Sequence, residues 1–178
     1  MKRLPVFIST KTAAGFLKLG VYQIIGGVIG ILFIGMAGWS VALINTWVAL
    51  LLLLAFLLFG YSILCGILLV MTKEAALKLS QINQALQLIS WTILGFSFKY
   101  VAGVFVSVGF DLTEAFKFNF NLGVSGFEFN FHRETERFEL NFNLMAIYLL
   151  YYTVMLDKKI KKETELHEFS EIGEPGNP

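Results

Sequence analysis

The chain has 178 residues and a net charge of only +1, with 56% hydrophobic and 15% charged residues. An average soluble domain carries roughly 25% charged residues, and a net charge near zero gives no electrostatic basis for binding nucleic acid. The charges are also segregated, because residues 19–72 contain no Asp, Glu, Lys, Arg or His. This stretch is too long and too apolar for a soluble core, so the sequence indicates an integral membrane protein whose main partner is the lipid bilayer.

The charge-free stretch predicts two transmembrane helices joined by a short loop. A helix needs about 20 apolar residues to cross the hydrocarbon core. The first predicted helix covers about residues 19–39 and the second about residues 45–71. A cleaved signal peptide is the alternative for the first segment, because Gly35 and Ala37 have the small side chains of a cleavage site. The apolar run is longer than the roughly 7–15 residues of a signal peptide, which favours a retained helix.

The first predicted helix is rich in glycine. Gly26 and Gly30 form a small-xxx-small pair, which permits close contact with a neighbouring helix. Packing within the chain and formation of a homo-oligomer both fit this pattern. Four uncharged polar residues lie near the ends of predicted helices, where such residues bridge helices or contact headgroups: Gln23, Asn45, Gln84 and Gln87.

Two further apolar stretches predict a third transmembrane helix at about residues 82–106 and a fourth at about residues 142–156. The fourth is short for a crossing and would borrow residues from the segment before it. Lys99 is the only charged residue between residues 79 and 110. If the third helix continues to Phe110, Lys99 lies inside the bilayer, where an ionisable group is costly and usually functional. If the helix ends near Tyr100, Lys99 extends to water at the outer interface.

The basic residues predict that both termini are cytoplasmic. With four crossings, ten Lys and Arg residues fall on the side of the N-terminus and three, Lys117, Arg133 and Arg137, on the other side. Cytoplasmic segments carry the excess of basic residues, and the composition, with one Cys and frequent Phe, fits a bacterial inner membrane. Residues 1–162 then form one membrane domain. The polar residues 163–178 form a cytoplasmic tail that is partly disordered.

The segment before the last predicted helix alternates between apolar and polar residues. Runs with a period of two occupy residues 116–122, 127–131 and 138–144, and this period is typical of strands with one apolar face. Turn-like residues between the runs predict a three-stranded antiparallel meander, with Phe131 opposite Phe138. The meander is an extracytoplasmic insert at about residues 112–144.

The alternation predicts one apolar surface. Its candidate contact residues are Phe116, Phe118, Phe120, Phe127, Phe129, Phe131, Phe138 and Phe142. A sheet with one apolar face has to cover that face. Packing over the outer helix ends of the same chain, contact with lipid and contact with a partner protein are the three ways to do so.

The sequence contains no phosphate-binding loop, no serine hydrolase motif and no zinc peptidase motif, and neither His132 nor His167 has a second ligand at metal spacing. No enzyme activity, cofactor or metal is therefore expected. The predicted fold is a mainly α four-helix transmembrane bundle with the β insert between its third and fourth helices. We expect a small scaffold, accessory or assembly subunit that contacts a membrane protein or a second copy through helix faces and the Phe surface. A transporter or channel subunit with Lys99 in a polar path is the alternative.

Overall fold

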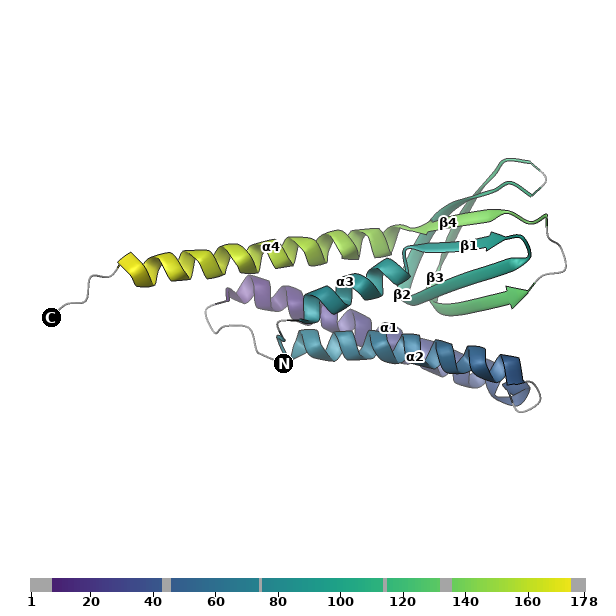
Figure 1. Cartoon of the computed structure of the whole chain (residues 1–178), viewed down its shortest axis with the longest axis horizontal. Coiled ribbons are helices and arrows are strands. Elements are labelled where there is room, and N and C mark those ends of the chain that lie inside the picture. The colour runs from purple at the N-terminus through teal and green to yellow at the C-terminus, as the bar shows by residue number, and fades with distance from the viewer. Residues whose placement is uncertain (1–7, 43–45, 74, 114, 132–135, 174–178) are drawn as a thin grey trace.

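The computed structural model describes residues 8–42, 46–73, 75–113, 115–131 and 136–173, which form four helices and four strands (Figure 1). The helices are α1 (Thr10–Ala42), α2 (Thr46–Val70), α3 (Ala76–Leu86) and α4 (Leu144–Gly173). The strands are β1 (Ile89–Ile93), β2 (Phe96–Asp111), β3 (Lys117–Phe131) and β4 (Glu139–Asn143). The first turn of α1 and the last turn of α4 lie toward the same end of the molecule, and the sheet lies at the other end (Figure 1).

Helices α1 and α2 form an antiparallel pair that runs beneath the sheet to its far end (Figure 1). Residues Thr10–Met36 of α1 and all of α2 are long and apolar enough to cross a membrane. Glycines bring the two backbones together, because a Cβ on Gly20 would lie 2.7 Å from the carbonyl oxygen of Gly66. Small residues permit this close approach of membrane helices.

The predicted four-helix transmembrane bundle is wrong. Within the described residues, only α1 and α2 have the length and hydropathy of a spanning helix. The predicted third crossing, residues 82–106, contains the end of α3, all of β1 and much of β2. Leu94 and Gly95 form the two-residue turn between these strands with φ angles of 52° and 83°, as a type I′ hairpin turn requires. The predicted fourth crossing, residues 142–156, starts in β4 and becomes helical at Leu144.

The predicted three-stranded meander is also wrong. The sheet has four antiparallel strands in the order β1–β4–β2–β3, and β1 pairs in addition with β2. β3 pairs with β2 from Lys117 to Phe131, so two of the predicted strands are one continuous strand. The predicted pairing of Phe131 with Phe138 is replaced by a pairing of Phe131 with Phe96.

The phase of the alternation explains this difference. The apolar side chains of β3 occupy even-numbered positions as far as Val124 and odd-numbered positions from Phe127 onward. In the sequence, this shift by one residue predicts a turn. In the structure, a β-bulge between Val101 and Val104 of the paired strand β2 accommodates the shift, so β3 continues without a turn. Gly103 lies in this bulge with a φ of 114°, a conformation that side chains other than glycine rarely adopt.

Strand β2 bends at the bulge. One edge of β2 pairs with β1 at residues 96–98 and with β4 at residues 107–111, while β1 and β4 pair with each other. These pairings close β1, β2 and β4 into a ring, with β3 paired along the outer edge of β2. The bent β2–β3 hairpin therefore has two arms, one before and one after the bulge (Figure 1).

Two apolar clusters join these elements to the α1–α2 pair. At one end, Phe16 and Leu69 pack with Leu77 of α3 and Leu156 of α4. At the other end, the cluster consists of Ile34, Ala55, Phe59, Tyr100 and Ala102. Helices α3 and α4 thus cover one half of the helix pair, and the sheet covers the other half.

Candidate functional site

The sheet is attached to α1 at Gly26. A Cβ on Gly26 would overlap the backbone of Gly103 in the bulge. The hydroxyl of Ser125 donates a hydrogen bond to the carbonyl oxygen of Gly26 at 2.7 Å and accepts one from the Gly103 N–H at 2.9 Å. The Tyr22 hydroxyl donates to the carbonyl oxygen of Val104 at 2.7 Å. The bend of the hairpin is therefore fixed to the middle of a membrane-length helix.

The two glycines that the sequence singled out have different neighbours. Gly26 packs against a strand, whereas a Cβ on Gly30 would overlap the Phe59 ring of α2. Phe59 in turn contacts Tyr100 of β2 edge to face, with 5.3 Å between ring centroids. Gly30 thus allows the helix–helix contact that supports the arm of the sheet before the bulge.

Buried amides and hydroxyls link three helices to β2. Tyr100 donates to Asn83 Oδ1 at 3.1 Å and to the carbonyl oxygen of Leu58 at 2.8 Å. The network continues through Asn83 to Ser62, from Ser62 to the Gln23 carbonyl, and from Ser80 to the Gln23 side chain. Gln87 accepts from the Ala102 N–H at 2.8 Å. Such bonds hold the sheet in one position, because an unpaired polar group in an apolar interior is costly.

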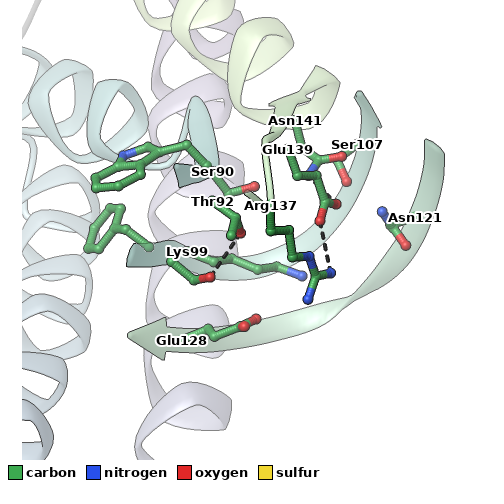
Figure 2. Close-up of a pocket in the computed structure, with 12 residues that line it drawn as sticks. Ser90, Thr92, Lys99, Ser107, Asn121, Glu128, Arg137, Glu139 and Asn141 are labelled. Atoms are coloured by element: carbon green, nitrogen blue, oxygen red, sulfur yellow. Dashed lines mark hydrogen bonds and ion pairs between the residues drawn. The ribbon is translucent and has the colours of Figure 1, made fainter. Parts of the chain in front are cut away.

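The inner face of the bent sheet lines a polar cavity of about 210 Å³ (Figure 2). The strand register explains its polarity, because polar residues pair with polar residues on this face: Lys99 with Glu128, Ser107 with Asn121, and Thr92 with Ser97. Arg137, Glu139 and Asn141 complete the wall from the β4 side. The cavity therefore collects two cations and two carboxylates from segments that are distant in the sequence.

Lys99 lies on a strand and faces this cavity (Figure 2). Its earlier placements, inside a bilayer helix or at that helix's end, both assumed a helix that does not form. The ammonium group lies 4.2 Å from the centroid of the Phe105 ring, a favourable cation–π contact. Within the described part of the chain, Lys99 forms no ion pair, whereas Arg137 is paired with Glu139 at 3.2 Å.

The carboxylates of the cavity already have hydrogen-bond donors. Glu139 accepts from Asn141 Nδ2 at 2.8 Å and from Asn119 Nδ2 at 3.3 Å, in addition to Arg137. Glu128 accepts from Asn130 Nδ2 at 3.0 Å and is exposed. The cations have more unused hydrogen-bonding capacity than the carboxylates, because an ammonium group has three N–H donors and a guanidinium group has five.

The outer face of the sheet is apolar, and the structure divides the predicted Phe surface into two parts. Phe127 and Phe129 are half-buried on the arm that faces the helices, and Phe127 contacts Phe98 with 6.3 Å between ring centroids. Phe142 is half-buried in β4, Phe138 just before that strand is 37% exposed, and the side chain of Phe131 lies outside the described part of the structure.

The arm after the bulge presents the other part, which we call the outer Phe surface. It consists of Phe110, Phe116, Phe118, Phe120 and Leu122, of which the last four are 62–69% exposed. The Phe110 ring contacts those of Phe116 and Phe118, with 5.4 Å and 6.0 Å between ring centroids. Sequence reasoning missed the contribution of β2, although Val104, Val106, Val108 and Phe110 repeat with the same period of two.

The outer Phe surface lies at the level of the apolar helices. The bend sits beside Gly26, and the apolar part of α1 continues for ten more residues to Met36, or about 15 Å at 1.5 Å per residue. Leu32 and Phe33 are exposed along this stretch. The sheet is therefore beside a helix surface that is itself apolar and exposed.

No protein family model, curated protein or solved structure matches this chain.

Proposed function

We propose that the chain is a two-helix membrane-anchored accessory subunit, without enzyme activity, that docks a membrane-embedded partner through the outer Phe surface. The observation that supports this function is the exposure of Phe118, Phe120 and Leu122 on β3 and of Phe116 just before it. Contiguous exposed apolar patches mark interaction sites, and aromatic residues are enriched among the residues that dominate binding energy. A membrane protein fits better than a soluble one, because the patch lies level with the exposed apolar residues of α1 and α2.

The free edge of β3 supports the same function. In the described sheet, β3 pairs only with β2, so its other edge presents backbone N–H and C=O groups. Open sheet edges accept an additional strand, and inside an apolar environment unpaired backbone groups are unfavourable. A partner that adds a strand here would satisfy the backbone and cover the outer Phe surface together.

The proposed orientation places the sheet on the outer side of a bacterial inner membrane. Helix α1 begins and helix α4 ends toward the end of the molecule opposite the sheet (Figure 1). The beginning of α1 carries Lys11 and Lys18, and the second half of α4 carries Lys158, Lys159, Lys161 and Lys162. Because basic residues mark the cytoplasmic side, α1 would begin and α4 would end in the cytoplasm.

Affinity purification from native membranes tests this function. The double variant Phe118→Ala/Phe120→Ala is compared with Leu57→Ala, which removes an equally exposed apolar side chain from α2, 63% exposed. We expect a stoichiometric protein that copurifies with the wild type and with Leu57→Ala but not with the double variant. An identical set of copurifying proteins in all three samples would rule out the surface as a docking site. Loss of self-association alone would identify the partner as a second copy.

A second candidate function is a transporter or channel subunit, which the polar cavity around Lys99 favours. If the chain transports a solute, the flux of that solute into proteoliposomes would fall to background for Lys99→Ala. It would stay unchanged for Lys117→Ala, which removes the same charge outside the cavity. Equal flux in both variants would reject this candidate.

A further inference from the structure

We propose that the cavity of the bent sheet binds a phosphate group, held by Lys99 and Arg137. This site is separate from the outer Phe surface, because the cavity is on the inner face of the sheet and that surface is on the outer face. The proposal therefore does not depend on the docking function, and each can fail without the other.

The first argument is the convergence of two cations. Lys99 reaches into the cavity from β2 and Arg137 from the segment before β4, and their charged ends point toward one another (Figure 2). Two like charges that converge repel each other unless anions lie near them. Glu139 forms an ion pair with Arg137, whereas Glu128, opposite Lys99 in the strand register, forms none with Lys99 among the described residues. Lys99 is therefore the cation of the cavity that an external anion would neutralise.

The second argument is the number and direction of unused donors. Arg137 uses one terminal nitrogen for Glu139, and the guanidinium group retains further N–H donors for a second oxyanion. Ser107 and Asn121 face the same space from the arm after the bulge. Donors that approach from β2, β3 and the β4 side match the tetrahedral oxygens of a phosphate group better than the planar pair of oxygens of a carboxylate.

The size of the cavity allows a ligand of this class. A single bound water needs roughly 10–15 Å³ of such space, and the cavity offers about 210 Å³. Phosphate can arrive here as a free ion or as part of a lipid headgroup, and the two sources are tested separately. Glu128 is the competing charge, since it is exposed at the cavity and lies opposite Lys99 in the strand register.

The free-ion source is tested with inorganic phosphate and the full chain in a detergent that contains no phosphate group. ³¹P NMR measures the binding. We expect Lys99→Gln to weaken binding about tenfold or more, because a charged hydrogen bond is lost, and Lys99→Arg to retain most of it. Glu128→Gln should tighten binding severalfold. Lys117→Gln is the matched control, because Lys117 lies on the same face but outside the cavity, and it should bind as the wild type does.

Native mass spectrometry tests the lipid source. The chain is released from nanodiscs that contain phosphatidylglycerol or a neutral glycolipid with the same acyl chains. Retention of phosphatidylglycerol that is lost in Lys99→Gln would identify a headgroup as the natural source. Circular dichroism and gel-filtration profiles establish that the variants are folded. The proposal is overturned if neither probe binds, or if Lys99→Gln and Lys117→Gln bind both probes equally.

Discussion

The helical end of the molecule and the sheet end are built on the same pair of helices, but they distribute polarity in opposite ways. At the helical end, buried amides and hydroxyls are enclosed between α1, α2 and α3, and hydrogen bonds join them. At the sheet end, an open polar cavity lies on one face of the sheet and the outer Phe surface is uncovered on the other. The polar groups of the helical end are covered by the chain itself, although Gln23 Nε2 and Gln84 Nε2 have no hydrogen-bond partner among the described residues. The sheet end instead presents two surfaces, one polar and one apolar, to its surroundings.

The largest loss of stability is expected when the attachment of the sheet to α1 is disrupted. Gly26→Ala places a Cβ against the backbone of Gly103 and 2.6 Å from the Ala102 carbonyl carbon, so we expect a loss of about 2–3 kcal/mol of unfolding free energy. Gly35→Ala in the same helix is the control, because a Cβ there meets nothing within 4 Å. It should be neutral or gain up to about 1 kcal/mol from helix propensity. Unfolding in detergent, followed by circular dichroism, measures both, and equal effects would contradict the close contact.

The next largest loss of stability is expected when the hydrogen bonds that join the sheet to the helices are removed. Tyr100→Phe removes the hydroxyl that bonds Asn83 and Leu58, and we expect a loss of about 1–2 kcal/mol because a buried amide oxygen loses its donor. Tyr151→Phe, at a side chain that is 63% exposed, should change stability little. If the two variants unfold alike, the network does not join the sheet to the helices.

The junction between β4 and α4 separates the two ends. Asn143 Oδ1 accepts from the N–H groups of Met145 and Ala146 at 3.1 Å and 3.3 Å, as a helix N-cap does. We expect Asn143→Ala to cost about 1 kcal/mol, measured by the same unfolding experiment. Asn130→Ala on the exposed part of β3 is the control, and an equal loss there would argue against a capping role.

The smallest expected effect is a pH dependence at the helical end. Burial alone would raise the pKa of Glu163, but hydrogen bonds from Ser9 and Thr12 at the start of α1 outweigh it, and the pKa is lowered. A lowered folded-state pKa adds stability above the unfolded-state value near 4.5, and this stability is lost as the pH falls further.

Because this carboxylate is mostly exposed, the contribution is at most about 0.5 kcal/mol after solvent screening. Stability measured from pH 6 to pH 3 should fall less in Glu163→Gln than in the wild type. Parallel pH profiles for the two proteins would show that the contact contributes nothing.

Some of this architecture could be read from the sequence, and the physical reasons for the remainder are specific. The uninterrupted apolar run identified α1 and α2. The period of two around Phe118 and Phe129 identified β-strand structure with one apolar face. Residues 82–106 were misassigned because a short apolar run in a strand has the composition of a helix. The change of phase at residues 123–126 was interpreted as a turn, whereas it matches a bulge in the opposite strand at Gly103, because a turn and a bulge both shift the alternation by one residue.

The cavity could not be predicted, because its walls come from distant pairings. β1 pairs with β4 through Trp91 and Leu140, and no local pattern records such a contact. Lys99 was recognised as an unusual charge, but its surroundings depend on the bend of β2. Arg137 was counted only as a basic residue of the outer side and Glu139 as a polar position of a predicted strand, although β4 brings both to the cavity.

The contact of Gly26 with the bulge also has a consequence for biosynthesis. Gly26 is translated before Gly103 and Ser125, which follow only after both long helices are complete. The helices α1 and α2 are therefore synthesised while the contact surface at Gly26 is still uncovered, and the later strands cover it.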